Sequence, residues 1–260
     1  MKFYVIASSS KGNVSYLETG NKKILIDAGI SYTKIKKALK DIGVNIKHVT
    51  DIFITHEHSD HVKGLKVLMR YISPKLHMSL GTKEALQLSD DEVNVIGAFE
   101  EFIIEDLNVL PLPLSHDARE PLGFLFSNAK SKIVYITDTG YLSKGVLERI
   151  ENATLYYLET NHDPYLLTNS TRPYYLINRI LNEKGHLSNY DAAYYFSKLI
   201  GKETTHLIHA HVSEECNTSE HIEKTYIEVL KAQKVDFSNV TFIEAKPDEP
   251  LEVIELWKYI

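Results

Sequence analysis

The stretch "DIFITHEHSDHVKG", residues 51–64, carries the most information about how this chain folds. It opens with a short apolar run that predicts a buried strand, and polar residues follow at once. His56, His58, Asp60 and His61 form the pattern H-x-H-x-D-H. Alternate residues of an extended loop point the same way, so the first two histidines can converge on one cation. The last two residues lie past the bend, where they can face a second cation.

The alternative for this stretch is a solvated polar loop in which histidines cluster by chance. A single histidine would favour that interpretation. Four potential ligands within six residues, directly after an apolar strand, instead favour a metal site. Neutral imidazole and carboxylate groups suit Zn²⁺, Mn²⁺ or Fe²⁺.

Composition places the chain among ordinary globular proteins, with 260 residues of which 43% are hydrophobic and 25% charged. Cys216 is the single cysteine, which excludes an internal disulfide and suits a reducing cytosol. The apolar run in "MKFYVIASSSKGN" is too short for a signal peptide, and no window is apolar enough to span a bilayer. We therefore expect a soluble cytoplasmic protein without a membrane partner. A net charge of −6 restricts nucleic-acid binding to a local patch.

Strand-like and helix-like patterns alternate along the chain, which predicts sheets covered by helices. No linker, repeat or low-complexity tract divides the sequence, so we expect one domain over residues 1–260. Ser188 followed by Asp191 predicts a capped helix start. The strand-like runs are 3–7, 14–19, 23–28, 51–55, 124–128, 132–138, 154–160, 206–212 and 240–245, and the helical patterns are 32–43, 62–72, 143–153, 188–201 and 219–234.

The motif resembles the hallmark of the metallo-β-lactamase superfamily, and "ILIDAG", "PLSHDA", "YITDTG" and "LIHAHVS" continue the match. The resemblance implies an α/β fold, a four-layer αββα sandwich, with two divalent metals (Zn, Mn or Fe) at one edge. Asp27 would orient ligands without binding metal itself. The implied ligands are His56, His58, His116 and Asp138 for the first metal, and Asp60, His61, His211 and Asp138 for the second.

Each of these matches has a plainer alternative. Asp27 and Asp138 can start turns, and His116 can be an ordinary surface histidine. His209 competes with His211, because it lies two residues earlier on the same strand. The resemblance of "AHVS" to the superfamily's "AHLS" favours His211.

"YYLETNHD", "EKGHLSNYDAA" and "LIHAHVS" follow one another as in the phosphodiesterase branch of the superfamily, especially the tRNase Z type. That resemblance implies that His186 protonates the leaving oxygen and that Glu159 orients it. An imidazole with a carboxylate partner suits this task near neutral pH. Asp60 is counted with these two as catalytic, besides being a ligand. The alternatives are a helix-terminal histidine and a surface acid.

Over the whole length the sequence is most similar to the bacterial YycJ (WalJ) family. "SSSKGN", "TDTGYLS", "ETNHD", "GHLSN" and "AHVS" carry this similarity, although Ser9 replaces the usual glycine of the first motif. It implies a metal-dependent 5′-to-3′ exonuclease that uses metal-activated hydroxide as nucleophile. The implied partner is nucleic acid, DNA rather than RNA.

Three other functions stay open, because the metal chemistry does not choose a substrate. One is a small-molecule cyclic phosphodiesterase of the PhnP type. Another is an acyl hydrolase such as a lactonase or thioesterase. The third is a metal-binding module without catalysis, although no expected ligand is replaced.

Residues 168–185, "TNSTRPYYLINRILNEKG", place two arginines and two tyrosines just ahead of His186. Arginines can hold phosphates, and tyrosines can stack on bases. We therefore expect Arg172, Tyr174 and Arg179 to bind substrate. The alternative is an amphipathic helix whose tyrosines pack on the core.

Overall fold

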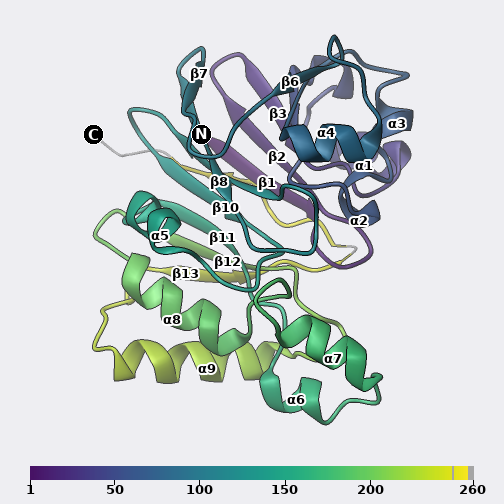
Figure 1. Cartoon of the computed structure of the whole chain (residues 1–260). Helices are drawn as coiled ribbons and strands as arrows, with labels where there is room; N and C mark the ends of the chain where they lie inside the picture. The colour runs from purple at the N-terminus through teal and green to yellow at the C-terminus, as the bar shows by residue number, and fades with distance from the viewer. Residues whose placement is uncertain (248, 257–260) are drawn as a thin grey trace. The chain divides into compact units, whose positions relative to one another are not determined.

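A computed structural model describes residues 1–247 and 249–256 of the chain (Figure 1). It consists of two compact units. Unit 1 comprises Met1–Pro113, Ala118–Ser131 and Ala245–Ile260, and unit 2 comprises Leu114–Asp117 and Lys132–Glu244. The chain passes between the units repeatedly, which favours our expectation of one domain, and that expectation stays a prediction. None of the helices in the described ranges is long and apolar enough to cross a membrane.

Unit 1 contains a mixed sheet that is antiparallel from β14 to β3 and parallel from β3 to β6. Its helices follow the parallel strands, as crossover connections require. The sheet order is β14 (Ile254–Glu255), β1 (Lys2–Ala7), β2 (Val14–Thr19), β3 (Lys22–Ile26), β4 (Asp51–Phe53), β5 (Lys75–Met78) and β6 (Val93–Val95). The helices are α1 (Tyr32–Asp41), the short 3₁₀ helix Ile46–His48, α2 (Ser59–Val62), α3 (Leu65–Leu68) and α4 (Leu80–Leu86).

Unit 1 also contains three antiparallel strands, β7 (Phe102–Ile104), β8 (Leu107–Pro113) and β9 (Leu122–Ser127). Aromatic rings join them to the mixed sheet. Phe53 of β4 makes edge-on contacts with Phe124 and Phe126 of β9, with ring centroids 5.2 and 5.3 Å apart. These rings are fully buried and fix the end of β4, where the histidine-rich loop begins.

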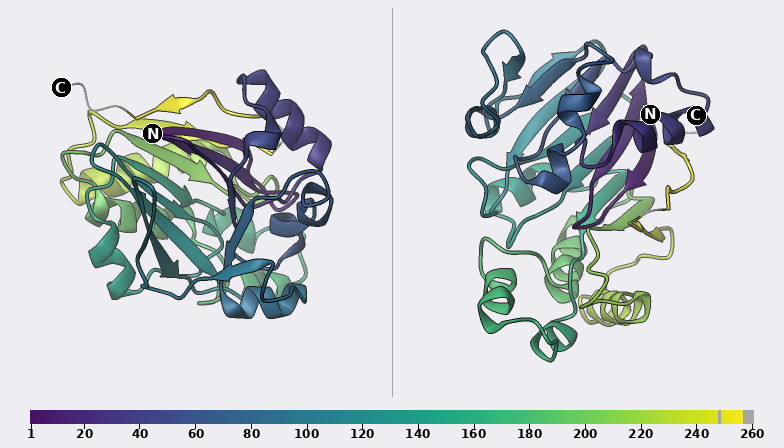
Figure 2. Two further views of the ribbon diagram at one scale, coloured as in Figure 1. Left: turned by 90° about the horizontal axis from the view of Figure 1, so that it is seen from above. Right: turned by 90° about the vertical axis from the view of Figure 1, so that its right-hand side faces the viewer.

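Unit 2 contains four parallel strands, and the first three are buried on both faces, as their largely apolar sequences predict. The strands are β10 (Lys132–Ile136), β11 (Leu155–Glu159), β12 (His206–Ala210) and β13 (Thr241–Glu244). The helices are α5 (Lys144–Ile150), α6 (Pro164–Thr168), α7 (Tyr174–Leu181), α8 (Asn189–Leu199) and α9 (Ser219–Ala232). Figure 2 shows α6 and α7 as a pair of short helices distinct from α9.

The nine expected strand runs all contain strands, whereas β5, β6, β7, β8 and β14 had not been expected. The predicted cap of α8 is confirmed: the Ser188 hydroxyl accepts from Asp191 N–H at 3.1 Å. The helix expected over 62–72 is interrupted, and only α3 lies inside that range. Gly64 causes the break, because its N–H donates to the Ala28 carbonyl and a Cβ there would clash with backbone.

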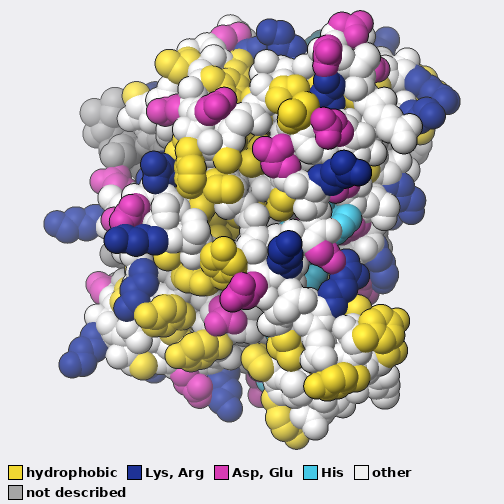
Figure 3. All heavy atoms as spheres, in the orientation of Figure 1, with side chains coloured by type: hydrophobic (Ala, Val, Ile, Leu, Met, Phe, Trp, Pro, Cys, Tyr) yellow, Lys and Arg dark blue, Asp and Glu magenta, His cyan; other side chains and the backbone are white. Residues whose placement is uncertain are grey.

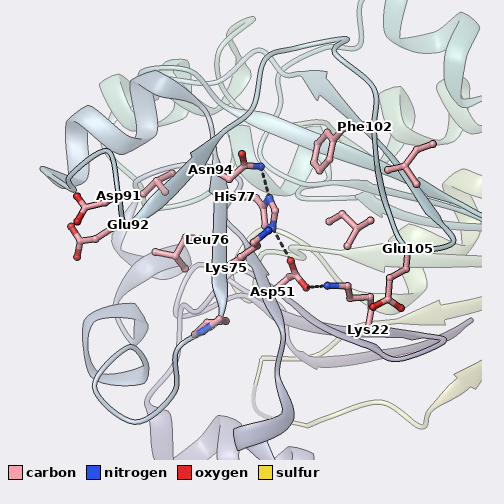
Figure 4. A pocket seen from close by; sticks show the side chains of 14 residues that line it. Lys22, Asp51, Lys75, Leu76, His77, Asp91, Glu92, Asn94, Phe102 and Glu105 are labelled. Atoms are coloured by element: carbon pink, nitrogen blue, oxygen red, sulfur yellow. Dashed lines mark hydrogen bonds and ion pairs between the residues drawn. The ribbon is translucent and has the colours of Figure 1, made fainter.

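A ladder of polar side chains crosses four neighbouring strands of unit 1 (Figure 4). Lys22 of β3 lies 3.2 Å from Asp51 of β4, and Asp51 accepts from His77 of β5 at 2.9 Å. The other ring nitrogen of His77 is 2.9 Å from the Asn94 amide of β6. The ladder borders a cavity of about 630 Å³. Because the buried groups pair with one another, the ladder accounts for polar atoms inside the sheet.

Candidate metal centre

In unit 1, Asp27 holds the histidine-rich loop from the end of β3. Its carboxylate accepts from the Thr55 N–H at 2.8 Å, from the Thr55 hydroxyl at 3.0 Å and from His61 Nδ1 at 2.8 Å. All three residues are buried. A carboxylate only accepts, so the proton of His61 lies on Nδ1 and its Nε2 carries the lone pair. This is the geometry that the orienting role predicted for Asp27 requires.

The remaining histidines of this loop lie close together. His56 Nε2 is 3.0 Å from His58 Nδ1, and His56 Nδ1 is 3.1 Å from the Thr55 hydroxyl. The two ring nitrogens share a hydrogen bond at this distance, and the same pair could instead converge on one cation. The loop that follows β4 therefore brings both members of the H-x-H pair together, as their spacing predicted.

Asn13 connects the "SSSKGN" turn to the other half of the motif. Its amide nitrogen is 3.3 Å from the Asp60 carboxylate and 3.1 Å from His61 Nε2. The backbones are equally close, because Asn13 N–H donates to the Asp60 carbonyl at 2.7 Å. A Cβ on Gly29 would lie 1.6 Å from that carbonyl, so only glycine fits there.

In unit 2, Glu159 at the end of β11 is the centre of a hydrogen-bond network. Its Oε1 accepts from Nδ1 of both His186 and His211, each at 2.8 Å. Its Oε2 accepts from the N–H groups of Thr139 and Leu187 at 2.9 and 3.2 Å. Burial acts to raise the pKa of Glu159, but His186 and His211 outweigh it and bring the pKa below its ordinary value. The glutamate is thus a buried anion at neutral pH.

Asp138 and His116 lie beside this network. Asp138 Oδ1 is 3.2 Å from His211 Nδ1 and 3.9 Å from His116 Nε2. His116 Nδ1 donates to the Gly185 carbonyl at 3.2 Å, and burial lowers the pKa of His116. One ligand atom from each of Asp138, Glu159, His186 and His211 lies within 4.8 Å of the others. Unit 2 therefore brings its predicted ligands and the predicted proton donor together at this end of its strands.

Three of the predicted residues have left-handed backbone. The φ angles are 62° at Asp27, 52° at Asp138 and 51° at His211. Each residue follows closely after the end of a strand, which is β3, β10 or β12 respectively. The left-handed residue ends the extended backbone and with it the alternation of side chains between the two faces of the sheet. Such a conformation is costly for a residue with a Cβ and often marks a functional position.

This turn decides between His209 and His211 as the partner of the acidic groups. His209 lies within β12 and is buried against Tyr226 of α9, with ring centroids 4.4 Å apart. Its Nδ1 is 3.2 Å from the Thr160 hydroxyl, and burial lowers its pKa to about 3. His211 instead contacts Glu159 and Asp138. Within unit 2, His211 rather than His209 therefore lies with the acidic groups, and its role as a metal ligand stays a prediction.

The donor groups fit divalent metal ions. Four of the predicted histidine ligands use Nδ1 in a hydrogen bond that leaves Nε2 as the electron-pair donor, the usual arrangement of metal-binding histidines. The pairs are His56 with Thr55, His61 with Asp27, His116 with Gly185 and His211 with Glu159. His186 also uses its Nδ1 in a hydrogen bond to Glu159, so its Nε2 can carry a proton to a substrate.

Sequence reasoning missed several residues of these networks. Asn13, Thr55 and Thr139 had no assigned role, although each lies inside or beside a recognised motif. His162 of "ETNHD" was also unassigned. Its side chain is 1% exposed, and neither ring nitrogen has a hydrogen-bond partner among the described residues. Burial lowers the pKa of His162 to about 4, so it is neutral at pH 7.

The residues expected to bind substrate lie on and around α7. Arg172 is paired with Glu215 at 3.0 Å, and Arg179 with Asp117 at 2.6 Å. Tyr174 is 78% exposed, whereas Ile177 of the same helix is buried. The alternative was an amphipathic helix whose tyrosines pack on the core. α7 is amphipathic, but its tyrosines are exposed and do not pack on the core.

Buried histidines and acids at the ends of strands, in a fold of two sheets flanked by helices, define a metal-dependent hydrolase. A family model described as the Beta-lactamase superfamily domain matches residues 22–210, and the chain belongs to that superfamily. The expected fold class and the resemblance to the YycJ (WalJ) family are thereby confirmed.

Known relatives match nearly the full chain. Exodeoxyribonuclease YycJ of Bacillus anthracis is 35% identical over 236 residues, which cover 89% of both chains. Exodeoxyribonuclease WalJ of Streptococcus pneumoniae serotype 2 is 35% identical over 237 residues, 88% of both chains. The metallo-beta-lactamase fold protein YhfI from Bacillus subtilis has a TM-score of 0.72 at 14% identity, covering 96% of this chain and 99% of its own.

Proposed function

We propose that the protein is a dinuclear metal-dependent phosphodiester hydrolase that degrades DNA as an exonuclease, in the 5′-to-3′ direction. The proposal rests above all on one observation: Glu159 Oε1 accepts from both His186 and His211. One of these histidines can bind metal while the other holds a proton for a leaving oxygen. The names of the two relatives, at 35% identity, favour DNA as the substrate.

We propose that two metals bind. The first would be held by His56, His58, His116 and Asp138, and the second by Asp60, His61, His211 and Asp138. When bound, two divalent ions supply hydroxide at neutral pH and stabilise the charge of an in-line displacement. The sharing of Asp138 by both ions is part of this proposal. Zinc, manganese and iron all suit these ligands.

The chain's own residues would then control the proton. His186 donates Nδ1–H to Glu159, which fixes the orientation of the ring and leaves its Nε2 to hold the proton for the leaving oxygen. The alkoxide that leaves a phosphodiester of DNA needs such a proton, because it is a poor leaving group. Within unit 1, Asp27 and Thr55 would keep His61 oriented as a metal ligand.

A substrate panel tests this function. Wild-type protein loaded with Zn²⁺ or Mn²⁺ would be assayed on 5′-labelled DNA, bis-p-nitrophenyl phosphate, a cyclic nucleotide and a lactone. We expect hydrolysis of the first two, loss of activity with chelator and recovery with metal. Preferred turnover of the cyclic nucleotide would support the small-molecule alternative, and turnover of the lactone alone would overturn phosphodiester hydrolysis. The length of products from DNA labelled at either end gives the direction.

Elemental analysis tests the number of metals. We expect two tightly bound divalent ions per chain after reconstitution, and one or none would contradict the dinuclear proposal. A cytoplasmic location, in keeping with the single cysteine and with DNA as substrate, completes the proposal.

A further inference from the structure

Unit 2 contains a cavity between α9 and the strands β12 and β13, which we name the α9 cavity. Its volume is about 360 Å³, and none of its lining residues is a predicted metal ligand. Sites for small molecules usually have a volume of about 300–1,000 Å³, apolar and aromatic walls, and a few polar groups that orient the ligand. The α9 cavity has the size of such a site, so its walls and polar groups indicate what it can bind.

Aromatic rings form much of the wall of the α9 cavity. The ring of Phe242 lies 6.1 Å from the rings of Tyr226 and Phe237, measured between centroids, and meets both edge-on. Tyr226 is buried, whereas Phe242 is 36% exposed. An aromatic ring that borders a cavity in this way offers apolar surface to another planar ring. The wall therefore suits an aromatic ligand.

His209 is the buried polar residue of the cavity lining, with 5% of its surface exposed. Its Nδ1 is 3.2 Å from the Thr160 hydroxyl, which itself donates to the Leu158 carbonyl at 3.4 Å. The hydroxyl therefore accepts from Nδ1–H, and the Nε2 of His209 carries a lone pair. This Nε2 has no hydrogen-bond partner among the described residues. A ligand in the cavity could satisfy it by donating an N–H group.

The charged residues of the cavity lining are both acidic. They are Glu223 of α9 and Glu244 of β13, and no ion pair joins either carboxylate to a basic group in the part of the chain that the structure describes. Figure 3 shows acidic and basic side chains intermingled over one face of the molecule. The α9 cavity instead presents negative charge alone, which attracts a cation and repels an anion.

The walls of the cavity are fixed by the fold. The Tyr226 hydroxyl lies 3.1 Å from the Thr160 hydroxyl, and β13 pairs with β12 so that Glu244 lies opposite His209. Because the groups are already in place, little ordering is needed when a ligand binds. The inner face of α9 is buried through Ile222, Tyr226, Val229 and Leu230.

We propose that the α9 cavity binds a small aromatic amine whose ring also carries an N–H group, as an indolylalkylamine does. The ring packs against Phe242, and its N–H donates to Nε2 of His209. The ammonium group pairs with Glu223 or Glu244, and attraction between the cation and the aromatic faces strengthens binding. This inference concerns a second site and does not depend on the proposed nuclease function.

Calorimetric titration of the full chain with three indoles of similar shape tests the ligand class. Tryptamine is a cation, tryptophol is neutral and indole-3-acetate is an anion. We expect tryptamine to bind about 10-fold more tightly than tryptophol, and we expect no measurable binding of the anion. No binding of tryptamine, or equal binding of all three compounds, would overturn the inference.

A methylated probe tests the contact with His209 without changing the protein. 1-Methyltryptamine keeps the ring and the cation but has no ring N–H group. It should bind about 3- to 10-fold more weakly than tryptamine, because Nε2 of His209 then has no donor. Equal affinities of the two amines would show that the ring N–H is not recognised, which would contradict the proposed ligand class.

Two variants test whether the amine binds in this cavity. Phe242→Ala should weaken the binding of tryptamine and tryptophol alike, by about 10-fold. Glu223→Gln combined with Glu244→Gln should remove the preference for tryptamine and leave the affinity for tryptophol unchanged. Neither glutamate is buried, so this second variant keeps the test decisive even if Phe242→Ala does not fold. Unchanged binding of tryptamine by the double variant would overturn the inference.

The matched control changes two other acids of α9, Glu220 and Glu228, which are exposed and do not line the cavity. Glu220→Gln with Glu228→Gln should bind tryptamine as the wild type does, and an equal loss would mean that net charge attracts the amine. Titrations of metal-loaded protein and of protein with chelator should agree. Binding that requires the metal would assign the amine to the metal centre and overturn the inference.

Discussion

Glu159 accepts hydrogen bonds from two histidines through a single oxygen atom. His186 and His211 both donate Nδ1–H to its Oε1, and both lie near Asp138. What distinguishes them is burial: the His211 side chain is 3% exposed and that of His186 is 20% exposed. The more exposed ring is the one that a substrate can reach.

Replacing each histidine separately should therefore give different defects. His211→Ala should reduce metal content and activity together, because a ligand is lost. His186→Ala should keep both metals and slow cleavage of DNA by about 10²–10⁴-fold, the usual effect of losing a general acid. The defect should shrink on bis-p-nitrophenyl phosphate, whose leaving group scarcely needs a proton. Metal analysis beside kinetics checks this, and a His186→Ala protein that has lost a metal would contradict the proton-donor role.

Among the secondary-structure elements, the polar ladder across β3, β4, β5 and β6 ties stability to pH. Burial acts to raise the pKa of Asp51, but hydrogen bonds from His77, Thr50 and Lys22 outweigh it and lower the pKa to about 2. An unfolded aspartate titrates near pH ~3.9. The stability that Asp51 contributes is thus complete above about pH 4 and is lost as the pH falls towards 2.

Asp51→Asn should lower the free energy of unfolding by about 1–3 kcal/mol at pH 7, because it leaves the ladder incompletely paired. The difference from wild type should narrow between pH 4 and pH 2. Urea unfolding across this range measures it, with Asp91→Asn as control, since Asp91 is an exposed acid of the same cavity. A difference that stays constant down to pH 3 would rule out the proposed linkage.

Elements with apolar sequences were predictable, and those with mixed sequences were not. The strands β10, β11 and β12 are buried on both faces, so most of their residues are apolar. β8 contains Pro111 and Pro113, and proline is normally a sign against a strand. β7 and β6 have only three residues each, too few for a period to be recognised.

The candidate site was predictable wherever a ligand pattern was local. The close approach of the side chains in the H-x-H-x-D-H motif could be predicted, because its four residues lie in one loop. The choice between His209 and His211 depended on a left-handed residue, and spacing along the chain does not reveal one. The contact of Glu159 with both His186 and His211 could not be predicted either, because two histidines from distant segments of the chain must reach one oxygen atom.

For the whole molecule, the net charge of −6 limits how the proposed DNA substrate could be bound. If only Arg172 and Arg179 neutralise phosphates, the logarithm of the binding constant should fall with the logarithm of the salt concentration at a slope of about −1.4 for single-stranded DNA and about −1.8 for a duplex. Replacing both arginines with alanine should weaken binding and bring this slope towards zero, while a small phosphodiester is still cleaved.

Titrations between 50 and 300 mM salt would measure these slopes. Lys224 and Lys231, exposed cations of α9, provide a control with the same change of charge. Equal losses in the control would mean that net charge matters more than the position of the two arginines. Equal losses on DNA and on the small substrate would mean that the arginines shape the site.

Variants of this protein selected only for heat resistance should lose the aspartate at position 138. Its left-handed backbone and its closeness to the buried Glu159 carboxylate both cost stability before any metal binds. Asp138→Gly should therefore raise the melting temperature of the metal-free protein by a few degrees, about 1 kcal/mol, while abolishing hydrolysis. Calorimetry with chelator present would measure this, and a lower melting temperature would refute it. Improved variants of this chain should accordingly be screened for turnover as well as for thermal tolerance, because at this position the two goals select opposite residues.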